Sequence, residues 1–201
     1  MGVVLTLSNH EPFLLPSLEF DILPQSVPHS EYLNSSYHTD WALGESFHKA
    51  QKQSYFENTI FVLVADHGKL MPSQSDLTWD QFHIACLIYA PHLLSSSPKR
   101  ISRIGSQTDR LRAMHGLLDK PFLHHSWGRD ILYLPIEDQG FAMIVDGKGI
   151  GWAEDSYFLV DRIGTTASLF DLSQDPEREH DLWSKFPELA KKFQTRERSF
   201  L

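Results

Sequence analysis

Residues 58–68 read Asn-Thr-Ile-Phe-Val-Leu-Val-Ala-Asp-His-Gly, and this stretch indicates the fold. From Thr59 to Ala65 the chain is apolar or β-branched, without the polar alternation of a half-exposed strand. A strand that is apolar on both sides is typical of a central parallel strand covered by helices on both faces. Asn58 interrupts the pattern before the strand, and Gly68 permits a sharp turn after it. We therefore predict a buried strand that ends at Asp66.

Two potential metal ligands, Asp66 and His67, follow this strand directly. Ligands of open α/β sheets bind at the carboxyl ends of the strands. Adjacent residues can face one ion only after the chain has left the sheet, which Gly68 allows. A carboxylate oxygen and an imidazole nitrogen suit Zn, Mn or a similar divalent ion. We predict that both residues bind one metal ion; the alternative is an aspartate that caps the following turn beside an exposed histidine.

Toward the N-terminus, Val3–Leu7 is predicted to be a short buried strand that leads to His10. If this strand lies parallel to the Thr59–Ala65 strand, His10 reaches the same sheet edge and can hydrogen-bond a phosphate or sulfate oxygen or a leaving group. The alternative is a solvent-facing histidine in a loop. Glu11–Pro28 contains four prolines and is predicted to be a loop, whereas apolar residues recur at a helical period between about Ser30 and Gln53.

Toward the C-terminus, Ile84–Tyr89 is predicted to be a second buried strand, stopped by Pro91, and Ser106–Leu118 a helix. The later segments are short and separated by Gly or Asp, which indicates a small antiparallel sheet. They are Phe141–Val145, Gly151–Ala153, Tyr157–Val160 and Ser168–Leu172. An amphipathic helix over Pro187–Arg198 follows. The predicted class is α/β: a sandwich with parallel central strands and a small C-terminal antiparallel sheet.

The composition is that of an ordinary globular domain: 201 residues, 41% hydrophobic and 22% charged. A net charge of -8 argues against non-specific nucleic-acid binding. The mean hydropathy of -0.29 indicates a water-soluble chain, and its apolar runs are far shorter than the roughly 20 residues of a membrane span. Met1–Leu7 lacks a basic leader and a cleavage site, so we expect no signal peptide. Cys86 is predicted to be a buried, inert thiol.

Residues 58–68 also resemble the signature strand of the sulfatase/alkaline phosphatase superfamily, and they resemble most the lipoteichoic acid synthase-like phosphoglycerol transferases. Further stretches agree with family motifs in order and spacing. They are Ser8–Phe13 (similar to Asn-His-x-Pro-Phe), Tyr37–Gly44 (Tyr-x-Thr-Asp-x-Ala-Leu-Gly), Gly105–Asp109, Trp127–Leu132 and Leu169–Pro176 (Leu-Tyr-Asp-Leu-x-x-Asp-Pro). The resemblance covers nearly the whole chain. It departs from the family pattern after Asp109, where Arg110–Met114 replaces a usually apolar stretch.

The resemblance implies a partial alkaline-phosphatase-like sandwich, with Asp66 and His67 as ligands of one divalent metal ion (Mn, Zn, Mg or Ca) and His10 as a substrate-binding residue. It implies in-line displacement at phosphorus or sulfur through a covalent enzyme ester. The family's nucleophile lies far upstream of the His-x-Pro-Phe loop. Thr6 and Ser8 lie directly before that loop and are therefore poorly placed to be the nucleophile. We therefore expect no catalytic nucleophile in these residues, a chain that is inactive by itself, and an identity as the C-terminal portion of a catalytic domain.

Within that portion, residues 1–135 are expected to form the α/β core and residues 136–201 the antiparallel subdomain with its terminal helix. His83, Lys69 and Asp40 are weaker candidates for positions near the site. Expected partners are a phosphoglycerol-type lipid or glycan substrate, with a homo-oligomer possible through an exposed sheet edge. By analogy, the parent protein is placed in the cytoplasmic membrane with a periplasmic or extracellular catalytic domain. The alternatives are a sulfatase or phosphodiesterase of the same superfamily, or a catalytically inactive binding module.

Overall fold

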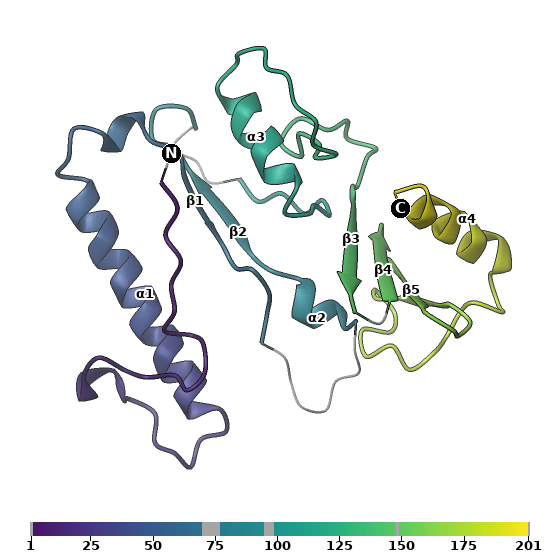
Figure 1. The fold of residues 1–201 in the computed structure, drawn as a ribbon, viewed down its shortest axis with the longest axis horizontal. Coiled ribbons are helices and arrows are strands. Elements are labelled where there is room, and N and C mark those ends of the chain that lie inside the picture. The colour runs from purple at the N-terminus through teal and green to yellow at the C-terminus, as the bar shows by residue number, and fades with distance from the viewer. Residues whose placement is uncertain (1, 70–76, 95–98, 148, 201) are drawn as a thin grey trace. The chain divides into compact units, whose positions relative to one another are not determined.

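The computed structural model describes residues 2–69, 77–94, 99–147 and 149–200, which belong to two compact units (Figure 1). The N-terminal unit comprises residues 1–59 and the C-terminal unit residues 60–201. The N-terminal unit contains the short 3-10 helices η1 (Leu18–Phe20) and η2 (Phe56–Asn58) and the long helix α1 (Ser30–Ala50). The C-terminal unit contains β1 (Phe61–Val64), α2 (Trp79–Phe82), β2 (Cys86–Tyr89), α3 (Asp109–Leu117), β3 (Phe141–Asp146), β4 (Gly149–Glu154), β5 (Tyr157–Arg162), β6 (Ser168–Asp171) and α4 (Pro187–Arg198).

Helix α1 organises the N-terminal unit, as its sequence period predicts. Phe20 of η1 is buried against it, with its ring centroid 4.7 Å from that of His38 and 5.1 Å from that of Trp41. The buried Asn34 accepts a hydrogen bond from the Leu23 amide and donates one to Asp21. These contacts fix the loop that precedes the helix onto one side of α1.

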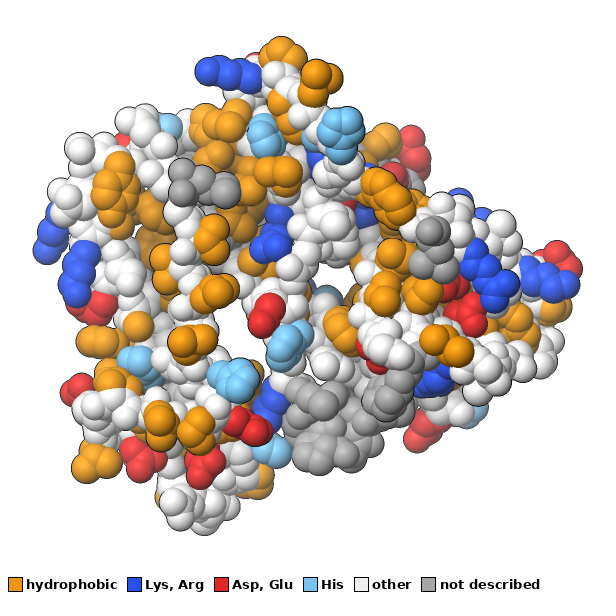
Figure 2. All heavy atoms as spheres, viewed as in Figure 1, with side chains coloured by type: hydrophobic (Ala, Val, Ile, Leu, Met, Phe, Trp, Pro, Cys, Tyr) orange, Lys and Arg blue, Asp and Glu red, His pale blue; other side chains and the backbone are white. Residues whose placement is uncertain are grey.

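Val3–Leu7 does not form the buried strand that the sequence predicts. These residues lie outside any strand, and Val3, Val4, Leu5 and Leu7 are each at least 78% exposed. β-Branched residues such as Val3, Val4 and Thr6 favour extended structure, but a strand needs a hydrogen-bonded neighbour, and no described segment pairs with this one. Hydrophobic side chains, orange in Figure 2, also reach the surface elsewhere on the face shown.

Strand β1 lies within the predicted Thr59–Ala65 run, but its pairing differs from the prediction. It pairs with β2 in an antiparallel ladder in which Val64 lies opposite Cys86. The expectation of parallel central strands is therefore wrong for this pair, because an unbroken apolar run indicates burial but does not encode strand direction. All four β1 residues are half-buried and β2 is mostly exposed.

Cys86 is exposed, which corrects the prediction of a buried thiol. The atoms packed around its sulfur still raise the pKa of the thiol, an effect that the nearby positive charge of Arg110 partly offsets. A raised pKa keeps the thiol protonated and weakly nucleophilic at neutral pH.

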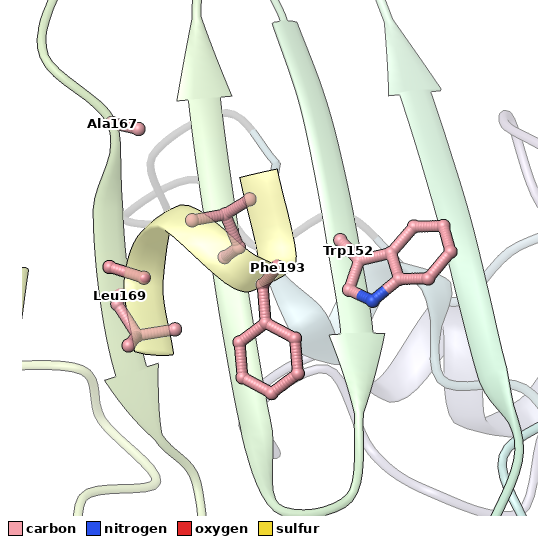
Figure 3. Close-up of a cluster of buried hydrophobic side chains, with 6 residues drawn as sticks. Trp152, Ala167, Leu169 and Phe193 are labelled. Carbon is pink, nitrogen blue, oxygen red and sulfur yellow. The ribbon is translucent and has the colours of Figure 1, made fainter. Parts of the chain in front are cut away.

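The C-terminal antiparallel sheet is confirmed, with strand order β3-β4-β5-β6. Adjacent residues of each strand face opposite sides of this sheet. Apolar side chains occupy both sides, so each face carries a buried cluster. Trp152, Leu159 and Leu169 belong to one buried cluster together with Phe193 of α4, which points at the sheet (Figure 3). On the other face, Phe158 and Val160 pack with Leu77. The mixed α/β class with this C-terminal sheet is confirmed.

None of the helices in the described part of the chain has the length and apolar character needed to cross a membrane. The expected division at residues 135/136 stays a prediction.

Candidate metal centre

The loop after β1 carries the predicted metal ligands, and backbone contacts define its course. The Gly68 amide donates a hydrogen bond to the Gln81 carbonyl over 2.6 Å. A Cβ at position 68 would lie 2.9 Å from the Asp80 carbonyl oxygen, closer than real Cβ atoms approach. Only glycine therefore allows the loop to pass this close to α2, which gives Gly68 a packing role beside the turn that the sequence predicts.

Asp66 and His67 lie side by side at the end of β1, and both are open to solvent. The Oδ2 atom of Asp66 is 3.8 Å from Nε2 of His67, and the two side chains are 89% and 59% exposed. The Asp66 carboxylate also accepts a hydrogen bond from the His67 amide over 2.9 Å. The structure therefore brings these two residues together, as the sequence predicts.

One nitrogen of the His67 imidazole forms a hydrogen bond with the backbone. Its Nδ1 lies 2.8 Å from the Gly68 carbonyl oxygen, which can only accept a hydrogen bond, so Nδ1 carries the proton in the neutral ring. The lone pair then lies on Nε2, the nitrogen nearer to the Asp66 carboxylate. This is the arrangement of a metal-binding histidine, whose second nitrogen donates to a carbonyl or carboxylate.

This pair of donors fits one divalent cation, although it does not complete a site. Two donor atoms about 2.1 Å from a tetrahedral zinc ion lie roughly 3.4 Å apart, so the observed 3.8 Å needs only a small adjustment. Among the described residues there is no group of three or more His, Cys, Asp or Glu side chains able to hold a metal ion. Asp66 and His67 therefore offer two donor atoms, fewer than the three or four protein ligands that a metal site usually has.

Gln107 contacts the same loop but was not recognised from the sequence as a site residue. Its Nε2 donates to the carbonyl oxygens of Ala65, over 3.3 Å, and Asp66, over 2.9 Å. Gln107 lies in the Gly105–Asp109 stretch, so the motif placed it in the family pattern without indicating what it touches.

Two motif stretches that are separate in the sequence meet at a buried ion pair. Asp109, which is 1% exposed, lies 2.9 Å from the Arg129 guanidinium and accepts hydrogen bonds from the Arg129 and Ser106 amides over 2.6 and 2.7 Å. The Arg129 guanidinium also stacks on Phe141, 3.7 Å from the ring centroid. Asp109 and Arg129 thus fix the end of the segment that presents Gln107.

The other predicted site residues lie in varied settings. His10 is exposed, and its Nδ1 lies 2.8 Å from the Glu11 carbonyl oxygen. Asp40 is exposed on α1, in the N-terminal unit like His10. Lys69 is half-buried directly after Gly68. His83 is exposed and packs on Trp79 with ring centroids 4.7 Å apart, and it forms no metal-binding group with other described ligands. The roles of these four residues stay predictions.

The mixed α/β fold matches a solved structure of the alkaline phosphatase superfamily, and a family model agrees with this class. The sulfatase family model matches residues 1–120. The chain therefore belongs to the sulfatase family.

Several solved structures resemble the chain over most of its length. An alkaline phosphatase superfamily protein from Vibrio parahaemolyticus is 27% identical, with a TM-score of 0.66 over 82% of this chain and 39% of its own. Ps i-CgsB is 14% identical, with a TM-score of 0.70 over 90% of this chain and 46% of its own. The putative sulfatase yidJ from Bacteroides fragilis is 18% identical, with a TM-score of 0.65 over 90% and 45%. The chain thus spans less than half the length of these proteins.

Proposed function

We propose that this chain supplies Asp66 and His67 to a divalent-metal site that cleaves or transfers phospho- or sulfo-esters. The observation that carries the proposal is the paired geometry at the end of β1, with an imidazole lone pair on Nε2 3.8 Å from a carboxylate oxygen. Membership in the sulfatase family supports ester chemistry at this position.

The roles of the two residues follow from their chemistry. The Asp66 carboxylate contributes negative charge and a hard oxygen ligand, and His67 contributes Nε2 while its Nδ1–H bond to Gly68 holds the ring in the ligating tautomer. When bound, a divalent ion neutralises charge on the transferring group and favours ionisation of the attacking group. No residue of this chain is assigned as the nucleophile.

Within this chemistry we favour phosphoglycerol transfer, with a phosphoglycerol-type lipid or glycan as substrate and His10 as a residue that hydrogen-bonds an ester oxygen. The ordered motifs between Asn9 and Pro176 support this branch. The alternative is a sulfatase, which the structural likeness to a putative sulfatase supports equally well. If the chain belongs to the transferase branch, we expect the parent protein to act at the outer face of the cytoplasmic membrane.

Calorimetric titration with zinc and with manganese tests the metal site. We expect weak binding, because two protein ligands fall short of the usual three or four. Asp66→Asn and His67→Gln should each weaken it by more than about tenfold. Matched controls are Asp155→Asn, in the exposed turn between β4 and β5, and His125→Gln, in an exposed loop. Equal affinity in wild type and Asp66→Asn would contradict the proposal.

Ligand binding separates the two branches without requiring turnover. With the histidine rings labelled with ¹⁵N and zinc present, glycerol phosphate and a monosaccharide sulfate can be titrated in parallel. The transferase proposal expects glycerol phosphate to shift the ring signals of His67 and His10 at the lower concentration. The reverse order would favour the sulfatase alternative. If neither ligand shifts either ring at millimolar concentration, the chain fits a binding module without ester chemistry.

A further inference from the structure

The side chain of Gln107 reaches from the segment before α3 to the end of β1, where it contacts the carbonyl oxygens of the two peptide units that flank the Cα of Asp66. Its amide nitrogen donates to the Ala65 and Asp66 carbonyl oxygens, over 3.3 and 2.9 Å. A primary amide has two N–H groups, so both bonds can form at once. Gln107 thus uses its full donor capacity on the segment that carries the ligand pair.

Arg110 determines which end of the Gln107 amide faces that loop. Its Nη2 donates to Gln107 Oε1 over 2.8 Å, and its Nε donates to the Gln107 carbonyl oxygen over 3.1 Å. A guanidinium has only donors, so Oε1 must face Arg110 and Nε2 must face the β1 carbonyls. Arg110 therefore holds the amide in one orientation and limits the rotamer freedom that Gln107 loses in reaching the loop.

These bonds constrain the backbone where the ligand side chains originate. The Ala65 carbonyl belongs to the peptide unit before Asp66, and the Asp66 carbonyl to the unit between Asp66 and His67. Fixing both units limits the backbone rotations of Asp66 and hence the directions of both ligand side chains. The Gly68 amide, which donates to the Gln81 carbonyl, restrains the same loop one residue beyond His67.

We propose that Gln107, oriented by Arg110, is a positioning residue that holds Asp66 and His67 in their metal-binding arrangement. The inference rests on the proposed function of Asp66 and His67 as metal ligands. It also gives a role to Arg110, the first residue of the stretch in which this chain departs from the apolar family pattern.

Two measurements on the 201-residue chain test the proposal. The first is amide hydrogen exchange of His67 and Gly68 without metal, because the His67 amide donates to the Asp66 carboxylate and the Gly68 amide to the Gln81 carbonyl of α2. The second is zinc affinity by calorimetry. Gln107→Leu removes both donors and the acceptor, whereas Gln107→Glu keeps an acceptor for Arg110 and removes the donors. The matched control is Gln139→Leu, since Gln139 Nε2 also donates to a backbone carbonyl, that of Ile136, over 3.0 Å.

We expect both Gln107 variants to accelerate exchange at His67 and Gly68 by roughly three- to tenfold, and Gln107→Leu to weaken zinc binding by about tenfold. Arg110→Met should produce a smaller change in the same direction, and Gln139→Leu no change in either measurement. Exchange at His67 and Gly68 within twofold of wild type in Gln107→Leu overturns the positioning role. Wild type and Asp66→Asn could bind zinc with the same affinity while hydrogen exchange still responds to the Gln107 variants. That result would contradict the proposed metal site but support the restraint of the loop by Gln107.

Discussion

At the scale of single residues, the Asp109 carboxylate is buried, and both of its oxygens accept hydrogen bonds. One oxygen accepts the Arg129 amide, and the other accepts the Ser106 amide and the Arg129 guanidinium. Removing one partner of a buried ion pair leaves the other charge without compensation, which is more costly than losing an exposed pair. Removing one partner of this pair should therefore lower the free energy of unfolding more than removing one partner of an exposed pair.

The first prediction concerns this pair. Asp109→Asn keeps the shape of the side chain but leaves the Arg129 charge in a largely buried site, with 18% of its side chain exposed. We expect the free energy of unfolding to fall by about 3 kcal/mol, measured by urea denaturation. The control, Asp155→Asn in an exposed turn, should change it by less than about 0.5 kcal/mol. A loss below about 1 kcal/mol in Asp109→Asn would show that Arg129 finds other partners.

The second prediction compares two helical glycines. A Cβ on Gly116 of α3 would overlap the side chain of Asp130, whereas one on Gly44 of α1 meets nothing within 4 Å. Gly44→Ala should stabilise α1 by about 0.5–1 kcal/mol, because alanine has the higher helix propensity. Gly116→Ala should destabilise the C-terminal unit by about 1–3 kcal/mol despite the same propensity gain. Thermal unfolding followed by circular dichroism checks both signs, and a stabilising Gly116→Ala would contradict the close approach.

The sequence was sufficient to identify Asp66 and His67 as a pair, because both follow directly from the strand that precedes them. It could not identify the role of Gln107. That contact joins a side chain to a backbone carbonyl 41 residues away and leaves no periodicity or spacing signal. The meeting of Asp109 with Arg129 is hidden for the same reason, although each residue lies in a recognisable motif.

At the scale of elements, helix α4 is attached to the sheet by apolar contacts and carries one buried acid. Glu197 is 1% exposed, and its Oε2 has no hydrogen-bond partner. Burial, and then the negative charge of Asp161, raise the pKa of Glu197 to about 7. The charged form is therefore disfavoured where the last turn of α4 packs on the sheet.

The third prediction is a loss of stability on raising the pH. The folded-state pKa of about 7 lies above the ordinary value of 4.5, so the folded chain holds a proton that the unfolded chain releases. The free energy of unfolding therefore falls by roughly 1–3 kcal/mol in total between about pH 4.5 and 7. Above pH 7 this contribution no longer changes. Glu197→Gln should remove this dependence in urea titrations at pH 5 and 8. Glu188→Gln, on the exposed side of the same helix, should retain it. An identical pH profile in Glu197→Gln would contradict the assignment.

Most elements could be located from sequence period alone, and α4 agrees with its predicted bounds. The errors share one cause, since each depends on a partner that local pattern cannot specify. Val3–Leu7 has strand composition but no pairing strand among the described residues, and β1 and β2 are antiparallel although both looked like central parallel strands. Cys86 and Leu87 face opposite sides of β2 and are both exposed, so the first residues of this strand are covered on neither face.

At the scale of the whole molecule, the two compact units differ in the size of their cores. Among the described residues, the buried hydrophobic side chains of the N-terminal unit are Phe20, Ala50 and Phe56, whereas the C-terminal unit has two clusters around its four-stranded sheet. Buried apolar area is the dominant favourable term in folding. The N-terminal unit should therefore be the less stable of the two.

The fourth prediction follows from this difference. Hydrogen exchange in increasing urea should release the amides of α1 at a lower concentration than those of β4 and β5, because local stability follows local burial. In the variant Trp41→Phe, the remaining tryptophans all lie in the C-terminal unit, so their fluorescence change should follow the later transition. Coincident release of α1 and the sheet would show that the units unfold as one.

The order of strands in the C-terminal sheet also has a consequence for biosynthesis. Each strand from β3 to β6 pairs with the next one in sequence, so the contacts are local and the sheet forms quickly once its residues are available. A ribosome adds about 5–20 residues per second, so Val3–Leu7 and β1 leave the exit tunnel on the order of ten seconds before this sheet is complete. This locally connected sheet is therefore translated after Val3–Leu7 and β1, although its own strands need no earlier segment for their pairing.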